Sequence, residues 1–165
     1  MSLKSRRGNT LIEFTLVGIP LMLISTTVMV AGISMWEFYN LAYGTQTTAR
    51  YVAMHGRSCV QDGTSCALSV GNVASFFASH TLALDPSQTN VTLKSATATI
   101  TCNPVSSCNS NTNQFPNAND NGLNFDVTVT AFYTITNPGR MLLPAAAAGP
   151  ATFNLFATSR QRIVY

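Results

Sequence analysis

The stretch between Glu13 and Glu37 limits most strongly what this chain can fold into. Its 23 residues, 14–36, include no charged side chain. As a helix, such a stretch is about 35 Å long, whereas the hydrocarbon core of a bilayer is about 30 Å thick. The sequence therefore predicts one membrane-spanning helix here. Hydroxyl residues dilute its apolar character and can hydrogen-bond to their own helix or to a neighbouring one: Thr15, Ser25, Thr26, Thr27 and Ser34.

The basic residues around this stretch predict its orientation. Lys4, Arg6 and Arg7 precede it closely, and the next basic residue is Arg50. Because basic residues stay on the cytoplasmic side, we expect the N-terminus in the cytoplasm. Aromatic residues suited to the outer membrane interface come at the other end: Trp36, Phe38, Tyr39 and Tyr43.

Pro20 lies inside the apolar stretch, with Gly18 nearby. Proline removes a backbone hydrogen bond, so a kink or local unwinding is expected around Gly18 and Pro20. A cleaved secretory signal would have a shorter apolar region, about 7 to 15 residues, followed by a small-residue cleavage site. The length and the aromatic end favour a membrane anchor.

The distribution of charged residues excludes a nucleic-acid-binding surface. The net charge of +3 comes from the first eight residues, and the rest of the chain has six basic and six acidic side chains. No cluster of lysine and arginine remains that could follow a phosphate backbone. Only 9% of the 165 residues are charged, well below a typical soluble domain.

The four cysteines all follow the apolar stretch, as two close pairs. In a small exported domain they predict disulfides. Of the three connectivities, we favour Cys59–Cys66 and Cys102–Cys108, which close short loops. A zinc site formed by His55 with Cys59 and Cys66 is the alternative, but zinc ligands are usually spaced more tightly. No cofactor or metal is predicted.

The region outside the membrane predicts an α+β head. The long helix should continue to about residue 56, because apolar residues recur every three or four positions: Phe38, Leu41, Ala42, Thr45, Ala49 and Val52. A short helix is expected over 68–82. About three antiparallel strands follow, over 90–102 with a bulge near Lys94 and Ser95, 123–136 and 151–164.

Two loops interrupt this pattern. The segment 103–122 contains seven asparagines and is interpreted as an exposed connector or, less favoured, a ligand-binding loop. The segment 137–150 contains an apolar run and could contact another subunit or pack locally over the sheet edge. We find no catalytic constellation, since His55 and His80 lie in unrelated contexts without a nucleophile motif. We therefore expect no enzymatic activity.

The junction before the apolar stretch is the most specific pattern. It reads Arg6-Arg7-Gly8-Asn9-Thr10-Leu11-Ile12-Glu13-Phe14. This resembles the prepilin peptidase site of type IV pilins, in which cleavage follows the glycine and a glutamate is the fifth mature residue. The resemblance implies cleavage between Gly8 and Asn9. Asn9 departs from the small or apolar residues that are commoner at the first mature position.

The resemblance narrows to TadE-like pseudopilins of the tight-adherence (Flp, type IVb) pilus system. Leu16-Val17, Pro20-Leu21 and Ala49-Arg50-Tyr51-Val52-Ala53 extend the similarity over about the first 55 residues. It implies a leader over 1–8, a long helix over 9–56 that spans the membrane at 14–36, and a head over 57–165. It also implies a prepilin peptidase, other pilin subunits and an inner-membrane assembly platform as partners. The head would lie in the periplasm, and outside the cell after assembly.

Glu13 gives a physical reason to interpret the chain as a pilin-like subunit. A carboxylate at the start of a membrane helix is costly unless it finds a partner. Cleavage would create an α-amine on Asn9, and Glu13 of one subunit could pair with the amine of its neighbour and fix the axial register. We expect a minor pilin or pseudopilin. The alternative is a permanently anchored periplasmic or surface binding module that never polymerises.

Overall fold

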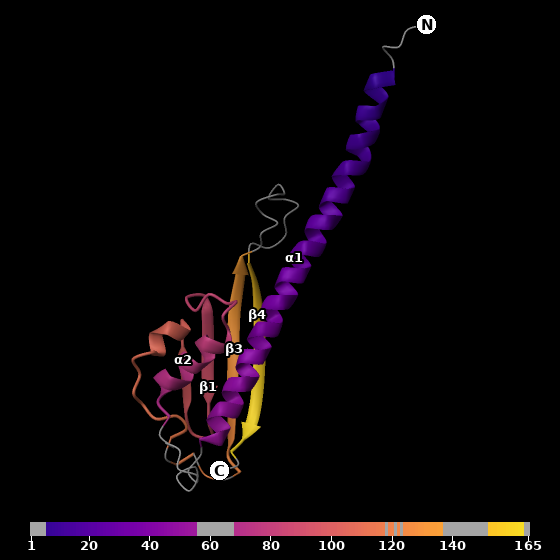
Figure 1. The fold of residues 1–165 in the computed structure, drawn as a ribbon. Helices are drawn as coiled ribbons and strands as arrows, with labels where there is room; N and C mark the ends of the chain where they lie inside the picture. The colour runs from indigo at the N-terminus through magenta and orange to yellow at the C-terminus, as the bar shows by residue number, and fades with distance from the viewer. Residues whose placement is uncertain are drawn as a thin grey trace. The chain divides into compact units, whose positions relative to one another are not determined.

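The computed structural model describes residues 6–55, 68–117, 119–120, 122, 124–136 and 152–163. The chain divides into two compact units, and in the long helix the boundary falls between Met35 and Trp36. In chain order the elements are α1 (Arg6–Met54), α2 (Val70–His80), β1 (Thr89–Lys94), β2 (Thr99–Cys102), the 3-10 helix η3 (Val105–Cys108), β3 (Asp126–Thr136) and β4 (Thr152–Arg162) (Figure 1).

Helix α1 runs for 49 residues. Its hydroxyl side chains donate to carbonyls three or four residues earlier, as expected: Thr26 Oγ1 to Met22 O at 2.9 Å and Thr27 Oγ1 to Leu23 O at 2.7 Å. These bonds satisfy the hydroxyls without a partner outside the helix. The helix ends at Met54, close to the predicted position, and Gly56 lies outside the described residues.

One antiparallel sheet of four strands, in the order β2-β1-β3-β4, follows. The expectation of about three strands is corrected here, because the expected strand 90–102 is two strands, β1 and β2. A turn joins them, in which Ser95 N donates to Ala98 O at 2.8 Å. The change of alternation at Lys94 and Ser95 therefore marks a hairpin turn and not a bulge. Both long strands, β3 and β4, lie close to their predicted places.

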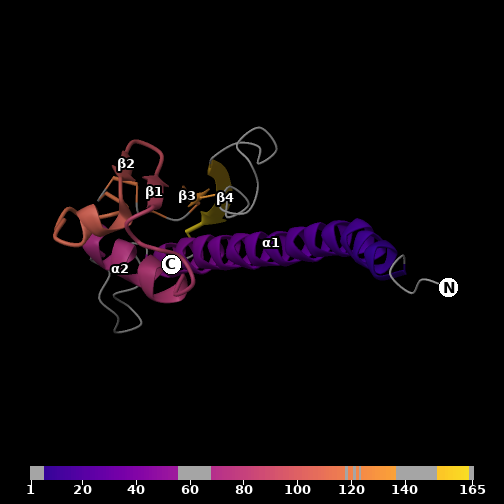
Figure 2. The same ribbon diagram turned by 90° about the horizontal axis from the view of Figure 1, so that it is seen from above.

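Both helices of the second unit cover the same face of the sheet (Figure 2). We call it the inner face. The part of α1 after Trp36 contributes Leu41, Ala49 and Val52, which are completely buried. The predicted strand 123–136 corresponds to β3, and its alternate residues place four buried side chains on this face: Val127, Val129, Ala131 and Tyr133. Burial of these apolar side chains against the helix stripe forms one core.

Helix α2 begins at a Ser69 N-cap, whose hydroxyl accepts from Asn72 N at 3.1 Å. Two further N–H groups of its first turn donate to the asparagine-rich loop: Val70 N to Asn113 O at 2.8 Å and Gly71 N to Asn111 O at 2.9 Å. A Cβ on Gly71 would lie 2.5 Å from Asn109 O, so glycine is needed for this close approach.

The described part of 103–122 contains more exposed than buried residues, as expected for a connector, but part of the segment also packs against the head. Phe115 is completely buried, and the segment satisfies the N-terminal donors of α2. Cys102 and Cys108 form the predicted disulfide, with 5.5 Å between their Cα atoms. The pair Cys59–Cys66 and the segment 137–150 lie outside the described residues.

Candidate functional site: the membrane-length helix and its junction

The first unit presents apolar side chains around the circumference of α1. Large apolar side chains from Ile12 to Met35 are 45–77% exposed: Ile12, Phe14, Leu16, Val17, Ile19, Leu21, Met22, Leu23, Ile24, Val28, Met29, Ile33 and Met35. The described residues contain one helix that is long and apolar enough to cross a membrane, by length and composition. A helix that is apolar on every side needs lipid or other helices around it.

The predicted junction lies within this helix. Because α1 begins at Arg6, the backbone of Gly8, Asn9 and Glu13 is helical. Four residues along a helix correspond to about 6 Å and bring Glu13 back to the side of Asn9. The carboxylate therefore lies one turn from the bond at which cleavage is expected. Residues 1–5, the first part of the expected leader, lie outside the described residues.

Gly18 and Pro20 lie further along the same helix. Pro20 is inside α1, and the helix continues on both sides of it. Because proline has no N–H, the carbonyl of Leu16 loses its usual helical partner. A Cβ on Gly18 would lie 3.9 Å from the Phe14 ring, an ordinary contact, so this glycine is not required for close packing. The kink at these two residues stays a prediction.

At the start of the second unit, Glu37 lies near the core. Its Oε2 atom is buried and has no hydrogen-bond partner among the described residues. Tyr133 of β3 is 8% exposed, and its burial, the Glu37 carboxylate and the Asp85 carboxylate together raise its pKa. Loss of the Tyr133 proton would therefore place a third negative charge in this region.

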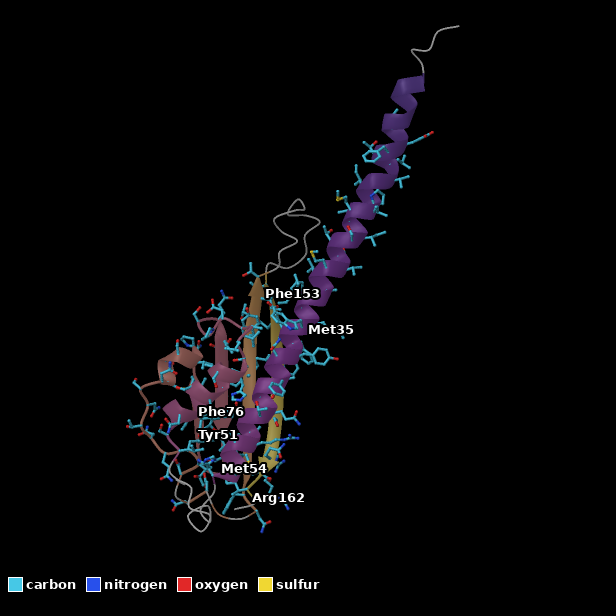
Figure 3. The ribbon with its side chains drawn as sticks, in the orientation of Figure 1. Met35, Tyr51, Met54, Phe76, Phe153 and Arg162 are labelled. Carbon is cyan, nitrogen blue, oxygen red and sulfur yellow. A yellow bond between two sulfur atoms is a disulfide. The ribbon has the colours of Figure 1, made fainter. Side chains whose placement is uncertain are left out.

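A column of four rings connects α1 to α2, which sequence reasoning missed. Tyr51 and Phe76 stack with centroids 4.0 Å apart and planes 6° apart (Figure 3). His80 stacks on Phe76 at 4.1 Å, and His55 lies 4.4 Å from Tyr51. The signal was the spacing, because each histidine follows its aromatic neighbour by four residues, one helical turn.

The two histidines are therefore part of the packing between the helices. Within each pair, Nδ1 of the histidine lies 2.7 Å or 2.9 Å from the backbone carbonyl of the aromatic residue four positions earlier. Among the residues that the structure describes, no group of three or more histidine, cysteine or acidic side chains could hold a metal ion. Cys59 and Cys66, needed for the alternative zinc site, are outside that part of the chain.

Comparison with protein-family models, with curated proteins and with solved structures found no match for this chain.

Proposed function

We propose that this chain is a structural subunit that assembles through its N-terminal helix, as a minor pilin or pseudopilin of a tight-adherence-type pilus or a related secretion apparatus. The observation that carries the proposal is the position of Glu13. It directly precedes the uncharged stretch 14–36 of a helix whose large apolar side chains, listed above from Ile12 to Met35, are exposed. Such a surface suits lipid before assembly and neighbouring helices after it.

The chemistry of assembly follows from one charge pair. In lipid, the Glu13 carboxylate is costly wherever it is not paired. Proteolysis after Gly8 would place an α-amine one helical turn before it. In a stack of parallel helices, the carboxylate of one subunit would pair with the amine of the next. An apolar environment strengthens this attraction, so the pair would fix the axial offset between subunits.

The back-bonded hydroxyls support the same proposal. Thr15, Ser25, Thr26, Thr27 and Ser34 all donate to carbonyls of their own helix. Their hydroxyl protons are therefore satisfied in lipid as well as in a helical stack. The segment is moderately hydrophobic for its length, which lowers the cost of leaving the bilayer during assembly.

The direct test is proteolytic processing. Co-expression of the full chain with a prepilin peptidase should remove residues 1–8, which intact mass spectrometry would detect. Gly8→Leu should block the reaction, because cleavage at the site that this junction resembles follows a glycine. Gly18→Ala is the matched control and should be processed normally, since its new Cβ makes only an ordinary contact. An unprocessed wild-type chain in a host that cleaves another prepilin would contradict the proposal.

A permanently anchored binding module is the second candidate. It is favoured by the exposed outer face of the sheet, which is described below. Such a module would keep its leader and would gain stability in the membrane from loss of the Glu13 charge. The two functions therefore respond in opposite ways to one substitution at Glu13.

A further inference from the structure

The side chains that point away from the helices form the outer face of the sheet. Strand register arranges them in rows across the sheet, and the three rows that include a residue of β1 are Asn90, Phe132 and Phe156; Thr101, Thr92, Thr130 and Thr158; and Thr99, Lys94, Thr128 and Arg160. We call them the aromatic row, the hydroxyl row and the cationic row. Neighbouring strands are about 4.8 Å apart, so each row is a closely spaced line across the sheet.

The aromatic row exposes two phenyl rings on paired strands. Phe132 is 44% exposed and Phe156 is 66% exposed, although a large aromatic side chain favours burial. Neither ring stacks on another ring in the described part of the chain. Their surfaces are therefore available to the C–H groups of a ligand.

The hydroxyl row crosses all four strands. Thr92 and Thr101 have their hydroxyl oxygens 3.4 Å apart, and those of Thr130 and Thr158 are 3.1 Å apart. A hydroxyl both donates and accepts, so each pair keeps unused hydrogen-bonding capacity. An uncharged row of this kind matches a ligand that itself carries many hydroxyls.

The cationic row borders a cavity of about 450 Å³. The cavity is lined by Lys94, Ser95, Ala96, Asn124, Phe125, Asp126, Thr128 and Arg160. This volume lies within the range of small-molecule sites, about 300–1,000 Å³. Phe125, 40% exposed, gives the cavity an apolar wall.

Charge at the cavity is positive overall. Arg160 pairs with Asp126 while its side chain stays 69% exposed, and Arg162 Nε lies 3.8 Å from the same carboxylate. Lys94 is exposed and has no ion pair with another described residue. The cavity lining thus has two cations, Lys94 and Arg160, and one carboxylate, and Arg162 adds a further cation beside that carboxylate. This excess of positive charge attracts an anionic ligand. Two copies meeting through this face would bring like charges together, so a second copy is disfavoured.

From this juxtaposition we infer that the outer face binds an acidic polysaccharide strand. Sugar rings pack on Phe132 and Phe156, sugar hydroxyls bond to the threonine row, and a carboxylate enters the cavity beside Lys94 and Arg160. The inference is independent of the assembly proposed above, because it uses only residues of the second unit.

Isothermal titration of the full chain in detergent micelles would test this inference. The probes are an oligogalacturonate of about ten sugars, a neutral galactan oligosaccharide of the same length, and dextran sulfate as a polyanion of different geometry. The oligogalacturonate should bind, more weakly as salt increases, and at least about tenfold more tightly than the neutral oligosaccharide.

Four variants locate the site. Phe156→Ala should weaken oligogalacturonate binding by about 5- to 10-fold, and Phe156→Tyr, which keeps the ring, should restore it. Lys94→Gln should weaken binding by about 3- to 5-fold. Arg50→Gln removes the same charge from an exposed position on α1 and should change binding by less than about twofold. Unchanged thermal melting would show that each variant is folded.

Three outcomes would overturn the inference. One is the absence of oligogalacturonate binding by the wild-type chain. Another is binding of all polyanions that Phe156→Ala leaves unchanged, which would indicate nonspecific charge attraction. The third is concentration-dependent self-association that Phe156→Ala abolishes, which would make this face a subunit interface.

Discussion

Asp120 connects the turn between β1 and β2 to the asparagine-rich loop. It is 1% exposed. Its Oδ2 atom accepts from Ser95 Oγ at 2.6 Å, from Thr97 N at 2.8 Å and from Thr97 Oγ1 at 2.7 Å. Burial by itself raises the pKa of Asp120, but the hydrogen bonds from Ser95, Thr97 and Ala98 outweigh it and hold the pKa below its ordinary value. The residue therefore stabilises the hairpin as a carboxylate.

Asp120→Ala should lower the free energy of unfolding by about 2–4 kcal/mol, since several donors lose a charged acceptor in a buried place. Denaturant unfolding of the head would measure it. Asp85→Asn is the control, because the Asp85 carboxylate accepts hydrogen bonds from Ser87 alone among the described residues, at the surface, and its change should have a smaller effect.

The sign of the pH dependence at Asp120 follows from its lowered pKa. The stabilisation should be fully present above the unfolded carboxyl pKa of about 3.9 and be lost as pH falls through the lower folded value. Asp120→Ala should therefore flatten the loss of stability below about pH 4. An unchanged acid profile would show that the carboxylate is not what holds the turn.

Among the elements, the contact between α1 and α2 depends on Gly44. A Cβ at this position would lie 2.1 Å from Thr81 Cγ2 and 3.5 Å from Phe77 Cε2. By helix propensity alone, Gly44 is only an unfavourable residue inside a helix. Glycine is needed at this position because α1 and α2 approach each other closely there, and helix propensity cannot predict such a contact.

Gly44→Ala should destabilise the head by about 1–3 kcal/mol, although alanine is the better helix former, because overpacking exceeds the gain in propensity. Adding Thr81→Ser removes the clashing methyl group, keeps the hydroxyl and should restore most of the stability. Gly32→Ala, which meets nothing within 4 Å, should leave the melting temperature of the head unchanged. A stabilised single variant would contradict this packing.

Periodicity predicted well the elements whose faces differ in polarity. The alternation of β3 and the stripe of Leu41, Ala49 and Val52 followed from hydrophobic burial alone. Periodicity failed for the turn at 95–98. A change in the alternation of polar and apolar residues is compatible with both a bulge and a hairpin. The turn is decided by Asp120, a partner more than 20 residues away. The rows of the outer face likewise depend on strand register, which no single segment specifies.

For the whole molecule, the two candidate functions make opposite demands on Glu13. In an assembling subunit, Glu13→Val should abolish entry into filaments while leaving insertion in the membrane intact. Glu13→Gln keeps the size and a hydrogen-bonding group but loses the charge, and it should be nearly as defective. Sheared surface fractions and whole-membrane fractions, compared by immunoblot, would separate assembly from expression.

The outcome for the Glu13 variants is interpreted together with whether the chain is cleaved after Gly8. If the chain is processed and both Glu13 variants still enter filaments normally, the charge pair is not the register device. If no filament contains the wild-type chain and Glu13→Val accumulates more than wild type in the membrane, the anchored module is favoured.

Strand β4 forms one margin of the sheet and is 11 residues long (Figure 1). Alternate backbone groups of such a strand face outward and can template a stray chain. Only its last part, with Arg160 and Arg162, carries charges that deter this. In a chain anchored in the membrane at high local density, the head would thus be exposed to incorrect strand pairing along the uncharged half of β4. Cells producing the chain in excess should accumulate sheet-rich aggregates, and a lysine near the middle of that half should reduce them.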